Sequence, residues 1–305
     1  MGEAMTLQLK SPAKINLGLF ILGKRQDGYH ELETLLQMVS LYDTLELTAL
    51  PAGIELICDH PGVPSDQTNL VVRAARLLLE KGAAGRALGC RIHLHKNIPA
   101  GAGLGGGSGN AGIVLRGLNQ LWQLHLSISQ LAEIAAQIGS DVPFFLGSPA
   151  ALGRGRGERL TPLQPAKKFY VILLYPRLAV ATSEVYRGLN LDLTKKQKNI
   201  NILHQFFSES DIASLGAHLH NDLEPVVFKR YPIVQKAKEA LSALDPDGVL
   251  VSGSGSTVFA IFGDSASARQ AFARLQGGDW DLFLTETVTS LSEFLPASLC
   301  HDLKP

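Results

Sequence analysis

The chain has 305 residues, long enough for two domains of moderate size with a sizeable buried core. Lys and Arg total 28 and Asp and Glu total 28, and this formal net charge of zero argues against nucleic acid as a partner. The three cysteines are odd in number and far apart, which argues against a disulfide framework. The N-terminus lacks a secretion-signal pattern, and no apolar run approaches the ~18 residues that cross a bilayer. We therefore expect a cytoplasmic protein with no membrane segment.

The first half of the sequence predicts strands followed by a helix and another strand. Apolar residues bounded by Gly, Pro and Asp indicate strands, and apolar residues three and four positions apart indicate a helix. The predicted strands cover residues 7–9, 15–22, 44–50 and 54–57, the helix residues 69–81, and a half-buried strand residues 90–95. The last strand leads directly into a glycine-rich segment.

A helix is expected to begin near Ser108, because apolar residues repeat at helical spacing from Ala111 to Trp122. A second helix, residues 129–137, ends at Gly139 and runs into Asp141. Residues 153–168 are rich in Gly, Arg and Pro, and we place a domain boundary there. Within this stretch, residues 153–158 predict a hairpin with solvated arginines.

The second half is expected to form strands 170–174, 249–251, 258–262 and 281–287 and helices 225–244 and 265–275. Residues 193–210 are polar and weakly patterned, which is typical of a mobile loop. The whole pattern predicts an α+β fold in two lobes, residues 1–162 and 163–305.

The glycine-rich segment, residues 99–110, predicts a phosphate-binding loop. Glycines admit positive φ and let backbone N–H groups point into one concavity, and the following helix N-terminus adds its positive dipole end. The spacing fits neither a dinucleotide fingerprint, which needs an acidic residue about 20 positions later, nor a P-loop, which needs Lys after the last glycine. The alternative, a merely flexible loop, rarely lies between a patterned strand and helix.

Three further motifs accompany this segment. Pro-x-Gly-x-Gly-Leu-Gly-Gly-Gly-Ser at residues 99–108, together with Ala-Lys-Ile-Asn-Leu at residues 13–17, resembles the signature of the GHMP kinases. The resemblance implies a ribosomal-protein-S5-like first lobe, a ferredoxin-like second lobe, and ATP with its Mg²⁺ in the glycine loop. Gly-Tyr-His at residues 28–30 and Asp-Val-Pro-Phe at residues 141–144 resemble the branch that phosphorylates a cytidine diphosphate sugar alcohol.

The resemblance carries over a set of site residues. It implies that Lys14 and Asp141 are catalytic, with Asp141 as general base, and that Asn16, Tyr29, His30 and Tyr186 bind substrate. It implies nucleotide contacts from Lys96, Pro99, Ala100, Gly101, Ala102, Gly103, Leu104, Gly105, Gly106, Gly107, Ser108 and Gly109. Many relatives have a second Ser where this chain has Gly109, so no hydroxyl role passes to that position. Residues 252–256, Ser-Gly-Ser-Gly-Ser, resemble the third family motif, whose backbone approaches the glycine loop.

From spacing alone, other interpretations of these residues stay open. Asp141 before Val-Pro is equally typical of a turn, and Lys14 of a solvated charge at a strand edge. Tyr29 and Tyr186 are also compatible with core aromatics, and His30 with a surface position. The histidines show no metal-binding spacing, so no protein-held metal is expected. The alternatives to the cytidine-dependent kinase are another GHMP kinase, of the homoserine or mevalonate type, and a non-catalytic nucleotide-binding module; the oligomeric state stays open.

Overall fold

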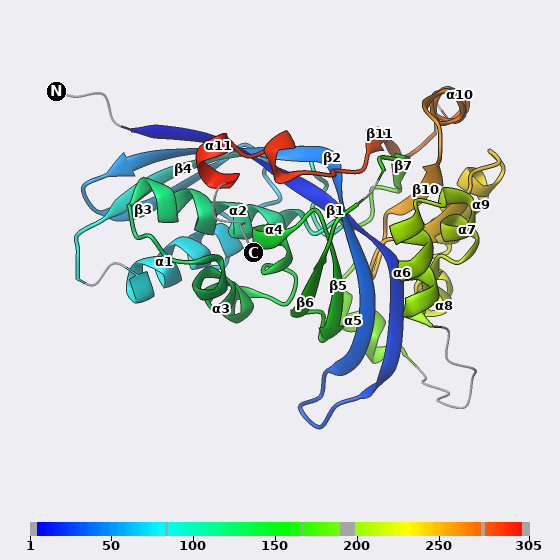
Figure 1. Cartoon of the computed structure of the whole chain (residues 1–305), viewed down its shortest axis with the longest axis horizontal. Coiled ribbons are helices and arrows are strands. Elements are labelled where there is room, and N and C mark those ends of the chain that lie inside the picture. The colour runs from blue at the N-terminus through cyan, green and yellow to red at the C-terminus, as the bar shows by residue number, and fades with distance from the viewer. Residues whose placement is uncertain (1–4, 83–84, 166, 190–198, 276–277, 301–305) are drawn as a thin grey trace.

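A computed structural model describes residues 5–82, 85–165, 167–189, 199–275 and 278–300, and Figure 1 shows its two sheets with their helices. Within these residues no helix is long and apolar enough to span a membrane.

The first sheet has seven strands and is organised by one long hairpin. Strands β1 (Thr6–Lys24) and β2 (His30–Leu50) pair antiparallel from Thr6 opposite Thr48 to Lys24 opposite His30. One end of β2 also pairs with β4 (Gly89–His95), which in turn pairs in parallel with β3 (Gly53–Cys58). The other end pairs with β5 (Ala150–Gly155), whose hairpin partner is β6 (Arg159–Leu163). The long strands β1 and β2 therefore join both parts of the sheet (Figure 1).

Four helices pack with this sheet. They are α1 (Leu70–Gly82), α2 (Gly106–Leu121), α3 (Ile128–Ile138) and α4 (Phe144–Gly147). Their apolar faces share one buried cluster with the sheet, in which Ala111, Val114 and Leu118 of α2 meet Leu45 and Leu47 of β2. Ser127 caps α3 in a capping box with Gln130, which fixes where that helix begins.

The second sheet has four antiparallel strands in the order β11, β7, β10, β9. These are β7 (Tyr170–Tyr175), β9 (Gly248–Val251), β10 (Val258–Phe262) and β11 (Asp281–Glu286). Helices of this part are α5 (Thr182–Arg187), α6 (Ile200–Glu209), α7 (Ile212–Ala217), α8 (Glu224–Arg230), α9 (Pro232–Ser242) and α10 (Ser265–Arg274). Since β7 and β10 are buried on both faces, they consist almost wholly of apolar residues.

Two segments of the second half return to the first sheet. The short strand β8 (His220–Asn221) pairs in parallel with Gly18 and Leu19 of β1. After β11, the chain forms a 3₁₀ turn (Leu291–Glu293) and α11 (Ala297–Cys300), drawn in red in Figure 1 beside the first sheet. The buried Arg116 of α2 donates to the backbone oxygens of Leu146 and Leu299, which ties this segment to the first core.

The structure confirms the α+β fold and most predicted elements, and it corrects three local predictions. The predicted helix 225–244 is two helices, because Pro232 cannot donate to the turn before it and a new helix begins there. The strands at 7–9 and 15–22 are one strand, and β2 begins at His30, 14 residues before the predicted strand at 44–50. Residues 150–163 form the hairpin β5–β6, which confirms the hairpin predicted at residues 153–158. Residues 200–209 are helical, whereas residues 193–198 of the predicted loop lie outside the described residues. The division into residues 1–162 and 163–305 stays a prediction.

Candidate functional site

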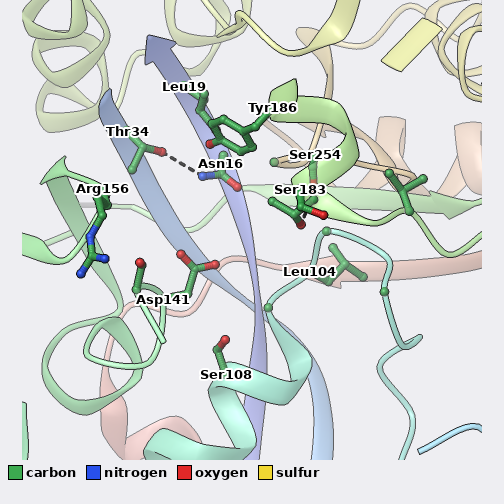
Figure 2. Close-up of a pocket in the computed structure, with 18 of the residues that line it drawn as sticks. Asn16, Leu19, Thr34, Leu104, Ser108, Asp141, Arg156, Ser183, Tyr186 and Ser254 are labelled. Carbon is green, nitrogen blue, oxygen red and sulfur yellow. Dashed lines mark hydrogen bonds between the residues drawn. The ribbon is translucent and has the colours of Figure 1, made fainter. Parts of the chain in front are cut away.

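A cavity of about 1180 Å³ lies where the two sheets meet, and Figure 2 shows part of its lining. Its walls come from β1, β2, the glycine loop, the turn at Asp141, the β5–β6 turn, α5 and the loop at residues 253–254. Segments far apart in the sequence therefore surround one space.

The glycine loop adopts a conformation that only glycines accept without strain. Gly101, Gly103 and Gly105 have φ of 67°, 79° and 69°. A Cβ atom at Gly103 would lie 2.3 Å from the backbone oxygen of Ser252, so this position also needs glycine for close approach to the third motif. Glycine is thus required here by both conformation and packing.

Helix α2 begins at the end of this loop with an uncapped first turn. Gly105 is its N-cap and provides no side-chain hydrogen bond, so the first N–H groups of the helix have no side-chain partner at the cap. Ser108, in the first turn, lines the cavity. An uncapped helix N-terminus facing a cavity is suited to phosphate oxygens.

Backbone hydrogen bonds hold the loop between the two halves of the chain. Lys14 N–H donates to Leu104 O at 2.9 Å, which covers the edge of β1. From the second half, Val180 N–H donates to Gly101 O and Thr257 N–H to Ala102 O, both at 3.1 Å. The Ser252 hydroxyl donates to Gly103 O at 3.0 Å, so the third motif does approach the glycine loop as expected.

Lys14 and Asp141 face each other in the cavity. The Lys14 Nζ lies 4.0 Å from the Asp141 Oδ2 and donates to the Asn16 Oδ1 at 2.6 Å. Asn16 donates in turn to the Thr34 hydroxyl at 2.8 Å, and Thr34 donates to Gly18 O at 2.7 Å. Figure 2 shows the Asn16–Thr34 bond of this chain and the Asp141 carboxylate. The ammonium group is thereby fixed in position from one side and faces the carboxylate on the other.

The two charged groups differ in burial. The Lys14 side chain is 5 % exposed and that of Asp141 44 %. Burial lowers the pKa of Lys14, and the nearby Asp141 carboxylate partly opposes this effect. The interpretation of Lys14 as a solvated edge charge is therefore wrong, although the edge position itself is correct.

An aromatic cluster forms the other end of the cavity. The rings of His30 and Tyr186 lie 5.3 Å apart at 38°. Burial, and then the charge of Lys24, lowers the pKa of His30, which favours its neutral form. Burial raises the pKa of the Tyr186 hydroxyl, with a further contribution from Asp141. Tyr29, also in the lining, is 55 % exposed, so the alternative of a core tyrosine is wrong at this position.

The cavity carries an excess of positive charge. Of the described residues in its lining, four are cations, Lys14, Lys24, Arg156 and Arg187, and one, Asp141, is a carboxylate. The Arg156 guanidinium lies 4.8 Å from the centre of the Tyr29 ring, so this arginine of the predicted hairpin is half-buried at the cavity instead of solvated. This balance favours ligands with several negative charges.

Most of the predicted site residues meet in this cavity, and two do not. Lys14, Asn16, Tyr29, His30, residues 99–108, Asp141 and Tyr186 all line it. Lys96 lies behind the loop and forms an ion pair with Asp43. Gly109 faces β1, where a Cβ atom would lie 2.9 Å from Ser11 Oγ, so α2 packs too closely for a larger residue. The nucleotide role of these two residues stays a prediction.

Several lining residues were not found from the sequence. Thr34, Arg156, Thr182 and Ser254 contribute polar groups, and the Thr182 and Ser254 hydroxyls are hydrogen-bonded at 2.9 Å. Ser254 lay in the serine and glycine repeat at residues 252–256 and Arg156 in the predicted hairpin at residues 153–158, but neither segment was predicted to contribute a side chain to the site. The others carry no local signal, because strand pairing and lobe contact alone bring them to the cavity.

Comparison with known proteins agrees with this geometry. The model of the GHMP kinases N terminal domain matches residues 69–148, and that of the GHMP kinases C terminal matches residues 203–278. The 4-diphosphocytidyl-2-C-methyl-D-erythritol kinase of Desulfotalea psychrophila is 44% identical over 88% of this chain and 89% of its own length. That of Pelotomaculum thermopropionicum is 43% identical over 93% and 98%.

Two solved structures resemble this chain, one in both sequence and fold and the other in fold alone. A crystal structure of 4-(cytidine 5'-diphospho)-2C-methyl-D-erythritol kinase matches with a TM-score of 0.75 and 33% identity, over 92% of this chain and 99% of that one. A homoserine kinase from Cytophaga hutchinsonii matches with a TM-score of 0.71 over 95% and 96%, but at 18% identity, which supports the fold alone. The chain therefore belongs to the GHMP kinase family and, within it, to the 4-diphosphocytidyl-2-C-methyl-D-erythritol kinases.

Proposed function

We propose that this protein transfers the γ-phosphoryl group of ATP to the 2-hydroxyl of 4-diphosphocytidyl-2-C-methyl-D-erythritol, a step of non-mevalonate isoprenoid synthesis. The observation that carries the proposal is the position of the Lys14–Asp141 pair, 4.0 Å apart, in one cavity with the glycine loop and the aromatic cluster. Phosphoryl transfer requires that the nucleotide and the cytidine-bearing acceptor bind in neighbouring sites.

The glycine loop supplies the ATP site in this proposal. Its glycines adopt positive φ and pack against Ala179, Ser252 and Lys14 with no space for a Cβ atom, and the uncapped N-terminus of α2 offers N–H groups to phosphate oxygens. Mg²⁺ carried with the nucleotide would neutralise phosphate charge, and the Ser108 hydroxyl is an oxygen ligand of the kind this ion prefers. Among the described residues no three His, Cys, Asp or Glu side chains form a metal cluster.

Asp141 and Lys14 divide the chemistry. The Asp141 carboxylate accepts the proton of the attacking hydroxyl, and Lys14 neutralises charge that develops on the transferred group. Because Lys14 is buried and held by Asn16, it needs little reorganisation during the transfer. Asp141, more exposed, is free to meet the hydroxyl of the acceptor.

The aromatic end supplies the cytidine site. Tyr186, His30 and Tyr29 offer ring faces for a pyrimidine and a neutral imidazole for its polar edge. Lys24 and Arg156 line the same end and suit a diphosphate.

Free Cys58, Cys90 and Cys300 are compatible with a cytoplasmic location, where thiols stay reduced.

An assay of ADP release across candidate alcohols tests the function. We expect turnover with 4-diphosphocytidyl-2-C-methyl-D-erythritol and ATP, and little with homoserine or mevalonate. Turnover of mevalonate or homoserine at a comparable kcat/KM would overturn the substrate assignment. ATP binding without turnover of any alcohol would point to the non-catalytic module.

A further inference from the structure

The carboxylate of Asp43 lies behind the glycine loop, outside the cavity. It belongs to β2, is fully buried, and accepts hydrogen bonds from four donors. Its Oδ1 atom accepts the backbone N–H groups of Asn97 and Ile98, both at 2.8 Å. These residues immediately precede the first residue of the loop, Pro99.

The second oxygen of Asp43 bonds to the other end of the loop. Its Oδ2 atom accepts Asn110 Nδ2 at 2.9 Å, and Asn110 lies in the second turn of α2. The Lys96 ammonium pairs with the same oxygen and also donates to Asn110 Oδ1 at 3.2 Å. One carboxylate therefore links both ends of the segment 99–109.

The position of Lys96 connects this linkage with the phosphate site. A Cβ atom on Gly106 would lie 3.2 Å from Lys96 Nζ, so the ammonium lies directly beneath the first turn of α2. Since this turn offers the N–H groups of the proposed phosphate site, a shift of Lys96 or Asn110 would shift those groups as well. Hydrogen bonds to charged groups are among the stronger ones, and buried ones hold their geometry closely.

We propose that Asp43 is a positioning residue that fixes the glycine loop for ATP, by tying the strand before the loop to the helix after it. The inference rests on the proposed function, because it takes ATP as the ligand of the loop. Asp43 does not line the cavity, so it can act on a ligand only through the glycine loop. We therefore expect a change in the affinity for ATP and almost none in the affinity for the cytidine substrate.

The chain offers a charge-neutral exchange as the central test. In Asp43→Asn, the remaining oxygen can still accept Asn97 and Ile98, but the new amide faces two donors, Asn110 and Lys96. The double variant Asp43→Asn/Asn110→Asp reverses the polarity of the bond and returns a carboxylate to Lys96. We expect Asp43→Asn to raise the KM and the Kd for ATP about tenfold or more, and the double variant to recover most of this loss.

Binding of a non-hydrolysable ATP analogue, measured by calorimetry without the alcohol, separates this proposal from the function. If the wild-type chain does not bind the analogue, the proposed function fails. If it binds and Asp43→Asn binds equally well, only the positioning role fails.

Two further variants keep the test valid if Asp43→Asn folds poorly. Asn110→Leu keeps the size of the side chain and the Asp43–Lys96 pair but breaks the link to α2, and we expect a similar loss of analogue affinity. Asp247→Asn is the matched control, since its carboxylate accepts Gly263 N–H at 2.7 Å away from the loop. It should change thermal stability without changing either KM. Equal changes in KM for ATP and for the cytidine substrate, or failure of a folded double variant to recover, would overturn the positioning role.

Discussion

The two ends of the cavity are built in different ways. At the phosphate end, the geometry is set by backbone: positive φ values at Gly101, Gly103 and Gly105, an uncapped helix, and hydrogen bonds between main chains. At the aromatic end, it is set by side chains of the β1–β2 hairpin, the β5–β6 turn and the six-residue helix α5.

This difference matches the ligand that each end binds in the proposed function. Because phosphate groups are the same in every nucleotide, backbone N–H groups provided by the fold are sufficient to bind them. A pyrimidine differs from other acceptors in its ring and its polar edge, and side chains are needed to distinguish it.

The largest expected effect lies between the two ends. Asp141→Asn should keep the binding of both substrates and lower kcat about 10²–10⁴-fold, because an amide cannot accept the hydroxyl proton. Lys14→Met should lose a comparable amount, and the double variant little more, since groups that act together are strongly non-additive. Steady-state kinetics with both substrates measure this. Near wild-type turnover of folded Asp141→Asn would make Asp141 a turn residue.

The phosphate end should respond to a change in backbone conformation. In Gly105→Val, the valine would have to adopt the φ of 69° found at this position, and its Cβ atom would lie only 2.9 Å from the Lys14 Cγ. We expect ATP affinity to fall about 100-fold, together with thermal stability. Gly147→Ala is the control, because this glycine lies outside the cavity lining and its Cβ atom would have no neighbour within 4 Å. Unchanged analogue binding by Gly105→Val in calorimetry would contradict the backbone cradle.

The aromatic end should respond to loss of a ring, and only for one substrate. Tyr186→Ala should raise the KM for the cytidine substrate about 5- to 150-fold, the range of base stacking, with the KM for ATP unchanged. Tyr29→Ala should do less, since that ring is more exposed. Tyr186→Phe keeps the ring and should keep the KM. Equal effects on both substrates would remove these residues from the cytidine site.

The smallest effect concerns the proton of His30. Its pKa in the folded protein lies below the ordinary value, so the unfolded chain binds the proton first as pH falls. The neutral histidine therefore contributes stability that is present above about pH 6.5 and is lost as pH falls below it. The difference in Tm between wild type and His30→Gln, followed from pH 8 to pH 5, should shrink towards low pH. A difference that grows would reverse the sign of the pKa shift.

The phosphate end could be predicted from sequence more fully than the rest of the site. A glycine-rich segment followed by a helix start predicts a phosphate-binding loop from residue types alone, and residues 99–108 of that segment line the cavity. Lys14 and Asp141 needed the family resemblance, since each type also occurs in turns and on strand edges. Arg156, Thr34 and Asp43 could not be predicted, because pairing between distant strands decides their neighbours. The break at Pro232 was available in the sequence and was missed, because the apolar spacing continues across it.

The return of residues 291–300 to the first lobe has a consequence for how the protein is made. Leu291, Phe294, Leu295 and Leu299 belong to the same buried cluster as α2. During synthesis the first lobe is made before these residues, so its core stays incomplete until the whole second sheet has left the ribosome. A chain truncated before residue 291 should therefore leave this part of the first core uncovered and be less stable than the full chain.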